Sequence, residues 1–401
     1  MADRLGAWTL KTGYQPASQV DRLLWLALVL LHIGAVAFVG LRQTAVDYPV
    51  YVLAAYGFLQ GDDVYSWGDE DYARAATTLG FDRYATPYRY PPLTALLAAL
   101  LVPFPRQGLW AWAAVQSAAW LITTALLGRL VPHGGQRRLV WVGIGLLVPF
   151  FVSLYAGQVN SLATLLAAAS LVALVSGRVL LAGWWLGLSL ALKPLAIGLA
   201  GLLIWEGWWR SMALALGAFG LALMFPAGVF GPAALHFWHP GSFGPTTYPP
   251  AQNLTGLAFR WLTGHPYGFS LLDDPNAAWW AGAVTAAVVW AITLWACWPP
   301  GQGGRKLQLR AGLMVAATLA TNPATWYHHA TMLGIPLAAL AGQVRKRPAW
   351  WWAALGLSYV LVTFWGIGWH RLVGFTPLLD LATLGMLGLW VLLVLETRWP
   401  N

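Results

Sequence analysis

Charged side chains and cysteine are both scarce in this chain. Asp, Glu, Lys and Arg make up 9% of its 401 residues, against about 25% in an average soluble domain. So little charge excludes an ordinary soluble protein, because a water-exposed surface needs more of it. Cys297 is the only cysteine, which excludes an internal disulfide bond and leaves the redox compartment undetermined.

Apolar residues are correspondingly abundant. They make up 59% of the chain, and the mean hydropathy is +0.60. A membrane-spanning helix needs about 17 to 25 mostly apolar residues, and such windows recur along the sequence. We therefore predict an all-α polytopic integral membrane protein with about twelve membrane segments, in which residues 1–401 form a single transmembrane domain. The predicted spans lie near residues 23–41, 109–131, 139–155, 158–176, 179–205, 211–230, 279–298, 311–325, 330–342, 349–367 and 378–395, with a shorter run at 92–104.

The distribution of basic residues indicates how the chain is oriented. Many of the residues behind the net charge of +9 sit in short loops. Cytoplasmic loops tend to carry Lys and Arg, so this pattern indicates topology, and nucleic-acid binding is not expected. The two longest loops, near residues 42–91 and 231–277, then fall on the non-cytoplasmic side. The short basic loops contain Arg137-Arg138, Arg305-Lys306 with Arg310, and Arg345-Lys346-Arg347.

The amino-terminal half allows two arrangements. If residues 92–104 cross the membrane and 179–205 form one span, Arg137-Arg138 falls outside, against the usual bias. If 92–104 turn back and 179–205 break at Lys193-Pro194, these arginines fall inside and Lys193 comes to the outer side. The run 23–41 is interpreted as an uncleaved anchor rather than a signal peptide, because about 19 apolar residues are available.

An acidic residue opens the first long loop. Asp47 lies in the segment Val46-Asp47-Tyr48-Pro49-Val50-Tyr51, at the start of a predicted helix that runs to Leu59 and stops at Gly61. One interpretation is that Asp47 caps this helix by accepting a backbone N–H bond. The other is that Asp47 is a general base at the membrane edge, with Tyr48, Tyr51 and Tyr65 shaping a sugar-sized pocket. The residues alone leave both open.

Several cationic or titratable side chains could accompany Asp47. Lys193 interrupts an apolar run, where an ionisable group costs roughly 2.5–3.5 kcal/mol, so a function or a snorkelling position must explain it. Arg260 and Arg89 lie in polar loops and could equally face lipid headgroups. His328 and His329 are adjacent, so they point in different directions on a helix. No zinc or EF-hand spacing occurs, and we expect no metal.

A series of short motifs gives the chain a family resemblance. In their order and placement they resemble glycosyltransferase family 87, whose members are GT-C type integral membrane enzymes that use polyprenyl-phosphate sugars. The resemblance spans about residues 20 to 345. It is carried by Asp47-Tyr48-Pro49-Val50-Tyr51, Gly61-Asp62-Asp63-Val64-Tyr65, Tyr90-Pro91-Pro92-Leu93, Gly157-Gln158-Val159-Asn160, Lys193-Pro194, Asn253-Leu254-Thr255-Gly256 with Arg260, and Asn322-Pro323-Ala324-Thr325-Trp326-Tyr327-His328-His329.

The resemblance implies a GT-C fold and a sugar transfer in which Asp47 is the catalytic base of an inverting displacement. It implies a polyprenyl-phosphate sugar as donor, with mannose as the sugar, and a glycolipid or glycan as acceptor. The donor is a substrate, so no cofactor is expected. For the departing phosphate we expect Lys193, Arg260, His328, His329 and Arg89. For substrate binding we expect Tyr48, Tyr51, Tyr90, Gln158, Asn160, Asn253 and Trp326.

Other functions fit the same composition. A related enzyme would transfer arabinose or glucose from a similar donor. A polytopic transporter or flippase would also be apolar and basic, and a scaffold subunit of envelope assembly would use the polar motifs only to join helices. For an enzyme of this kind we expect the plasma membrane as location, with the active site on the non-cytoplasmic face.

Overall fold

Helices form all the regular structure in the described part of the chain. The computed structural model describes residues 18–43, 45–85, 87–131, 134–237, 244–301, 304–343 and 347–399. Arg345 and Lys346 of the predicted basic loop lie outside these residues. The α-helices are α1 (Gln19–Arg42), α2 (Asp47–Gln60), α3 (Asp69–Leu79), α4 (Pro92–Ala99), α5 (Gly108–Gly128), α6 (Gly134–Gly145), α7 (Val148–Ala156), α8 (Asn160–Val175), α9 (Val179–Leu192), α10 (Ile197–Trp205), α11 (Trp209–Phe230), α12 (Leu254–Leu262), α13 (Pro275–Ala296), α14 (Arg305–Thr321), α15 (Gly334–Ala341), α16 (Ala349–Gly368), α17 (Thr376–Leu379) and α18 (Leu381–Arg398). Short 3₁₀ helices include η2 (Val64–Ser66), η3 (Pro194–Ala196), η4 (Pro232–Phe237), η5 (Tyr327–Leu333) and η7 (Trp369–Arg371).

Some of the helices have the length and the apolar composition that a membrane-spanning helix needs. Among the described residues, six helices are long and apolar enough to cross a membrane, and α6 and α7 together make one of them. Three shorter apolar helices lie at Asn160–Val175, Val179–Leu192 and Pro194–Trp205. The protein is therefore an all-helical membrane protein. The predicted count of about twelve segments is not confirmed, partly because several predicted spans are shorter or are broken by 3₁₀ turns.

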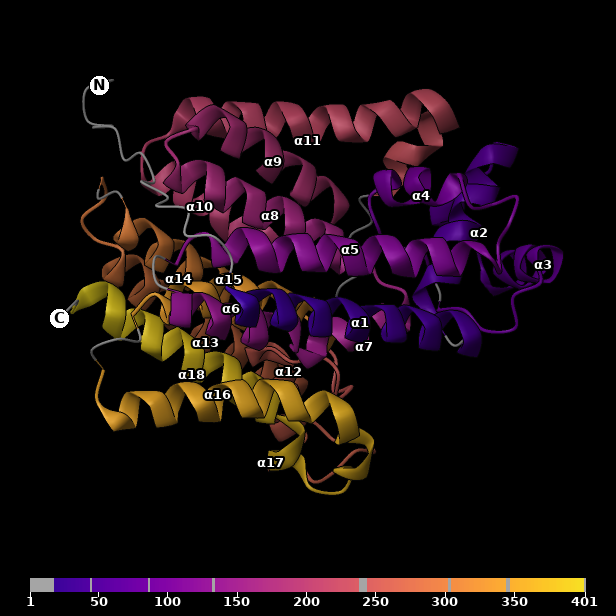
Figure 1. Ribbon diagram of the computed structural model, residues 1–401. Helices are drawn as coiled ribbons and strands as arrows, with labels where there is room; N and C mark the ends of the chain where they lie inside the picture. The colour runs from indigo at the N-terminus through magenta and orange to yellow at the C-terminus, as the bar shows by residue number, and fades with distance from the viewer. Residues whose placement is uncertain are drawn as a thin grey trace.

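Most long helices run side by side, and the connections gather at two ends of the bundle (Figure 1). At one end, Arg138 Nε of α6 donates to Asp21 at 2.8 Å, so the start of α6 lies beside the start of α1. Helices α2, α3 and α4 lie at the other end. Buried ion pairs join Glu206, at the end of α10, to Arg310 of α14, and Arg347, just before α16, to Glu396 of α18.

This arrangement decides between the two topologies that the sequence allowed. Helix α4 has eight residues and packs mainly on α2 and α11 instead of crossing the bundle. The segment 179–205 is divided at Lys193, and Arg138 shares its end of the bundle with the start of the described chain. A helix α4 that does not cross the bundle and a divided segment 179–205 are the two features that distinguish the second arrangement from the first.

Proline chemistry explains the break in that segment. Pro194 has no N–H to continue the helix, and its ring drives the preceding residue toward extended backbone. Lys193 accordingly has φ −162° and ψ 124° between α9 and η3. Its side chain is 7% exposed, so Lys193 lies inside the helix bundle and does not snorkel to the lipid surface.

Closely packed glycines hold α9 against α11. Ideal Cβ atoms on Gly183 and Gly187 would collide with the backbone of Ser211 and of Ala215. Only glycine allows the two helix backbones to come so near, as small residues four apart commonly do in membrane proteins. The packing fixes α9, and with it the position of Lys193 at its end.

We expect residues 70 and 178 to be accessible from opposite sides of the membrane, because α3 and the loop before α9 lie at opposite ends of the bundle. In intact cells, a membrane-impermeant maleimide should label Glu70→Cys and spare Arg178→Cys until the membrane is permeabilised. Both positions are exposed. The native Cys297 is fully buried and serves as the unlabelled background. Labelling of both variants from the same side would contradict this topology.

Candidate functional site

Asp47 is the first residue of α2, but it does not cap that helix. The cap position is Val46, and the helix begins without a side-chain hydrogen bond to its first N–H groups. The interpretation of Asp47 as a helix cap is therefore wrong. Its carboxylate is half-buried and interacts with Gln158 and Lys193. These are distant in sequence, so the fold has gathered a polar cluster around the acid.

A left-handed turn at Gly157 brings Gln158 to this cluster. Gly157 ends α7 with φ 78°, a conformation that glycine adopts without strain. A Cβ atom there would lie 2.9 Å from the backbone nitrogen of Tyr48, so only glycine also allows this approach to α2. Trp112 of α5 holds the turn from outside, since its indole N–H donates to the Gly157 carbonyl at 2.8 Å.

Gln158 is the centre of the cluster. Its carbonyl oxygen accepts from the Lys193 ammonium at 2.8 Å and from the Tyr51 hydroxyl at 3.0 Å. Its amide nitrogen donates to the Tyr90 hydroxyl at 3.0 Å. The rings of Tyr51 and Tyr90 meet edge to face with centroids 4.8 Å apart. Four of the predicted site residues thus meet in one network, although they come from four separate segments.

Lys193 has a second partner in Asn160. The ammonium donates to the Asn160 carbonyl oxygen at 2.8 Å, and Asn160 in turn donates to the backbone carbonyl of His328 at 3.0 Å. The ammonium also lies 5.1 Å from the centre of the Tyr90 ring, within the range of a cation–π interaction. Two amide oxygens and one aromatic face therefore hold a buried positive charge that lipid alone would strongly disfavour.

Burial changes the acidity of Asp47. Helix α2 lies outside the spanning helices, and burial raises the pKa of Asp47 to about 6, while its hydrogen bond with Gln158 and the charge on Lys193 oppose the rise. A carboxylate with a raised pKa is a stronger base than an ordinary one. It still ionises near neutral pH, which is the property that a general base requires.

The two histidines approach the same cluster in neutral form. Burial and the nearby charge of Lys193 lower the pKa of His328 and of His329 well below the ordinary value. The Nδ1 atom of His329 accepts from the backbone N–H of Trp326 at 2.9 Å. A neutral His329 ring therefore carries its proton on Nε2. Among the described residues, that buried Nε2 has no partner. His329 is therefore placed to donate a hydrogen bond, not to act as a cation.

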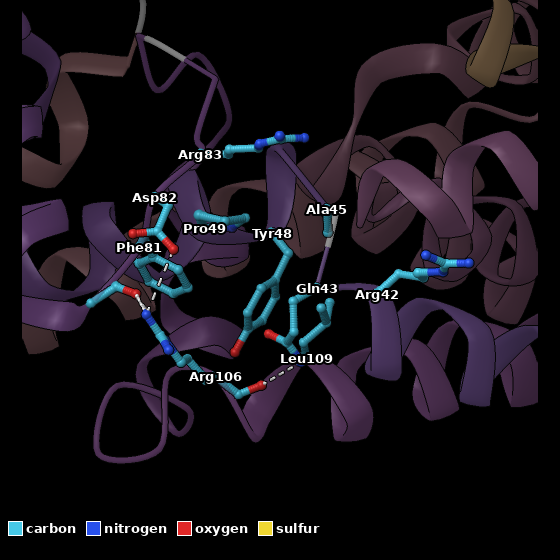
Figure 2. Close-up of a pocket in the computed structure, with 11 residues that line it drawn as sticks. Arg42, Gln43, Ala45, Tyr48, Pro49, Phe81, Asp82, Arg83, Arg106 and Leu109 are labelled. Atoms are coloured by element: carbon cyan, nitrogen blue, oxygen red, sulfur yellow. Dashed lines mark hydrogen bonds and ion pairs between the residues drawn. The ribbon is translucent and has the colours of Figure 1, made fainter.

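Tyr48 points away from this network. Its hydroxyl donates to the Pro105 carbonyl at 2.8 Å, and the residue lines a separate pocket of about 320 Å³ (Figure 2). Asp47 is not among the residues that line this pocket. The structure thus separates Tyr48 from Tyr51, two of the tyrosines that the sequence placed together around Asp47.

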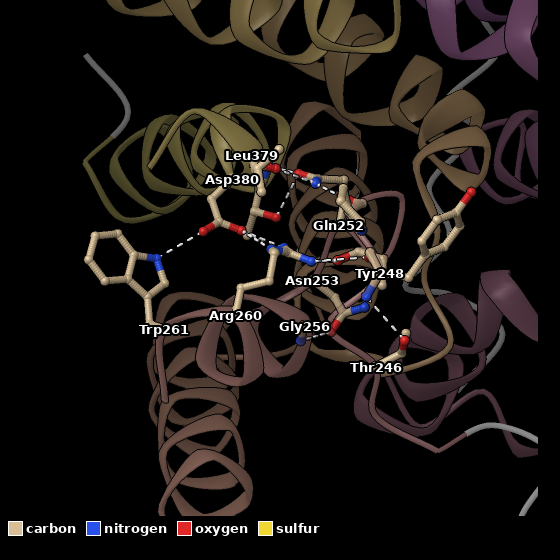
Figure 3. A network of polar contacts seen from close by, with 12 residues as sticks. Thr246, Tyr248, Gln252, Asn253, Gly256, Arg260, Trp261, Leu379 and Asp380 are labelled. Carbon is tan, nitrogen blue, oxygen red and sulfur yellow. Dashed lines mark hydrogen bonds and ion pairs between the residues drawn. The ribbon is translucent and has the colours of Figure 1, made fainter. Parts of the chain in front are cut away.

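Arg260 has a different set of partners from the one predicted. It lies fully buried on α12 and pairs with Asp380, which is 1% exposed (Figure 3). Its remaining donors reach the carbonyl oxygens of Ala251 and Tyr248, at 3.0 and 3.3 Å. Trp261 also donates to Asp380, at 2.9 Å. Because these bonds occupy the guanidinium, Arg260 joins α12 to the start of α18 and is left out of the phosphate-binding set.

Asn253 and Trp326 also belong to the packing around the site. Asn253 caps α12 by accepting from the Gly256 N–H at 2.8 Å, and its amide donates to the Thr325 carbonyl at 2.9 Å. The Trp326 ring lies 5.5 Å from Tyr248 and 6.1 Å from His328. Both residues therefore fix the loop that carries the histidines. Arg89 is exposed beside Tyr90, on the outer surface of the cluster.

Sequence reasoning missed several residues that the structure makes prominent. Asp380 is an acid at the start of a predicted span, and that isolation was the signal that could have identified it as the partner of a buried cation. Arg42, Arg83 and Arg106 line the pocket beside Tyr48, and no local motif marks them. In the described part of the chain, no group of three His, Cys, Asp or Glu side chains is placed to hold a metal ion.

The fold and site define an integral membrane protein with a buried acid, lysine and amide cluster at one end of its helices. A family model for glycosyltransferase family 87 matches residues 88–323, more than half of the chain. The chain therefore belongs to glycosyltransferase family 87 and is a membrane glycosyltransferase. No curated protein and no solved structure matches it. The matched range includes Tyr90, Gln158, Asn160 and Lys193, but it begins after Asp47 and ends before His328.

We expect Arg260→Met to destabilise the protein, because it leaves the Asp380 carboxylate buried without its partner. Removing one member of a buried ion pair typically costs about 3–5 kcal/mol, and an apolar replacement of both members recovers much of it. Thermal unfolding in detergent should show a large loss for Arg260→Met and a smaller one for the double variant Arg260→Met/Asp380→Leu. A stable Arg260→Met protein that fails to bind a polyprenyl phosphate would instead restore Arg260 to the donor site.

Proposed function

We propose that this glycosyltransferase moves a sugar from a polyprenyl-phosphate donor to a hydroxyl of a glycolipid or glycan acceptor at the non-cytoplasmic face. Mannose is the sugar that the family resemblance favours. The observation that carries the proposal is the junction at Gln158, where the acid Asp47 and the cation Lys193 meet inside one buried polar cluster. A base and a cation so close together are what a displacement at a glycosyl phosphate needs.

The reaction is a single displacement. The acceptor O–H gives its proton to the Asp47 carboxylate as the oxygen forms a bond to the anomeric carbon. The bond between that carbon and the phosphate oxygen breaks, its electron pair leaves with the polyprenyl phosphate, and the carbon inverts. Because the phosphate is already a good leaving group, the protein needs a base for the acceptor and positive charge for the phosphate, and no acid to protonate it.

Lys193 supplies the positive charge. Gln158 and Asn160 hold its ammonium at 2.8 Å each, so the charge is in position before the reaction and does not have to reorganise. Such preorganised charge in a water-poor site stabilises a developing anion far better than water does. The Nε2–H of His329 adds a neutral donor nearby. Tyr51 and Tyr90 act through Gln158 and are positioning residues.

We expect Asp47→Asn to fold normally and to lose about 10²–10⁴-fold in transfer rate, because a positioned base contributes about that factor. The assay supplies purified protein with radiolabelled polyprenyl-phosphate mannose and a membrane extract as the source of acceptor, and counts product. Asp62→Asn is the matched control, since Asp62 is an exposed acid at the far end of the same helix and should keep full activity. Full activity in the Asp47→Asn variant would reject the assignment of the base.

The raised pKa of Asp47 predicts an acidic limit to activity. The base works only when deprotonated, so kcat/KM should be low below the pKa of about 6 and should rise as the pH increases through it. An ordinary aspartate would place that limit near pH 4. The measurement is kcat/KM against pH at fixed ionic strength. A flat profile between pH 5 and 7 would contradict a buried carboxylate as the base.

A further inference from the structure

A second polar region lies beside the acid cluster and has no role in the reaction above. It is the pocket of about 320 Å³ between the end of α1, the start of α2 and the start of α5. Three arginines and one aspartate line it, so its wall is positively charged: Arg42, Arg83, Arg106 and Asp82. Figure 2 shows the arginines on different sides of Tyr48.

The arginines differ in how firmly they are held. Arg106 donates twice to the Gly80 carbonyl, at 2.9 and 2.6 Å, and lies 3.7 Å from Asp82. Arg42 lies over the Phe38 ring at 5.8 Å. Among the described residues, the guanidinium groups of Arg42 and Arg83 donate no hydrogen bond. The pocket therefore has one fixed cation and two whose donors can reach a ligand.

Helix ends add to the positive character of the pocket. Helices α2 and α5 both begin beside it, but the first N–H groups of α5 already donate to carbonyl oxygens of the preceding turn, Gly108 to Phe104 at 2.7 Å and Trp110 to Gln107 at 3.0 Å. These helices have 14 and 21 residues, so their amino-terminal dipoles are developed. Three arginines beside the positive ends of two helix dipoles favour a compact anion with several oxygen atoms, and phosphate is the anion that such a combination suits best.

The surroundings of the pocket are apolar and exposed. Leu41 precedes Arg42, and Leu100, Phe104 and Trp110 lie on the turn and helix that carry Arg106. Leu41 is 75% exposed and Leu100 is 80% exposed, far more than a soluble surface would leave to large apolar residues in one place. Arg42 is also the last residue of a candidate spanning helix. The pocket therefore opens where lipid chains meet the headgroup layer.

From these observations we propose that the pocket binds the phosphate-bearing headgroup of a membrane lipid, with its chains along the exposed apolar residues. The phosphate would contact Arg42 and Arg83, separately from the Lys193 cluster. An anionic phospholipid and a polyprenyl phosphate share this chemistry. The proposal does not depend on the sugar or the acceptor, because binding is measured without turnover.

Lipid binding to the full-length protein, delipidated in a neutral detergent, tests the proposal. The probes are fluorescent phosphatidylglycerol, diacylglycerol with the same chains but no phosphate, and a polyprenyl phosphate. The double variant Arg42→Gln/Arg83→Gln should bind phosphatidylglycerol about 25-fold more weakly than the wild type, and Arg83→Gln alone about fivefold more weakly. Arg74→Gln is the control, because Arg74 is an exposed arginine of α3 outside the pocket.

The outcomes separate clearly. Weakening confined to the pocket variants, with diacylglycerol binding poorly, supports the proposal. If only the polyprenyl phosphate shows this dependence, the pocket belongs to the lipid carrier, and if phosphatidylglycerol shows it too, the pocket accepts headgroups generally. The proposal is overturned if the double variant binds phosphatidylglycerol as tightly as the wild type does. It is also overturned if Arg74→Gln loses as much affinity as the pocket variants, or if diacylglycerol binds as tightly as phosphatidylglycerol. Thermal unfolding confirms that each variant is folded.

Discussion

The hydrogen bonds from the Lys193 ammonium to Gln158 and Asn160 are the interaction on which the site depends. A lysine inside a helix bundle is costly unless polar groups surround it, and here two amide oxygens at 2.8 Å provide them. Gln158 also reaches Tyr51 and Tyr90, and it interacts with Asp47. Losing one amide would therefore disturb both the cation and the base.

Two backbone features make that interaction possible. Pro194 breaks the helix at Lys193, and Gly157 allows the α7–α8 turn to touch the start of α2. Neither feature supplies a reacting group, yet each brings one to the cluster. The same reasoning applies to Arg260 and Asp380, whose buried ion pair joins α12 to the start of α18. It also applies to Asn253, which bonds to the loop before the histidines. The site thus consists of a small reactive centre and a larger set of residues that place it.

The sequence predicted the residues of the reactive centre better than the residues that hold them in place. The helix beginning at Asp47 and ending before Gly61 agrees with the structure, and Tyr51, Tyr90, Gln158 and Lys193 lie together in it. The break at Lys193 was one of two arrangements that the sequence left open. These features have local causes, namely proline, glycine and isolated polar residues in apolar runs. Arg260 was predicted to bind the donor phosphate, and Asn253 the substrate, from the family resemblance. Their partners lie about 70 to 120 residues away, and a single sequence does not reveal such pairings.

The most direct test of the account is an experimental structure of the protein with a polyprenyl-phosphate sugar bound. The account predicts that the phosphate lies within hydrogen-bond distance of the Lys193 ammonium. It also predicts that the anomeric carbon faces the Asp47 carboxylate, with space between them for an acceptor hydroxyl. A donor whose phosphate lies away from Lys193, or whose sugar points away from Asp47, would contradict the central claim.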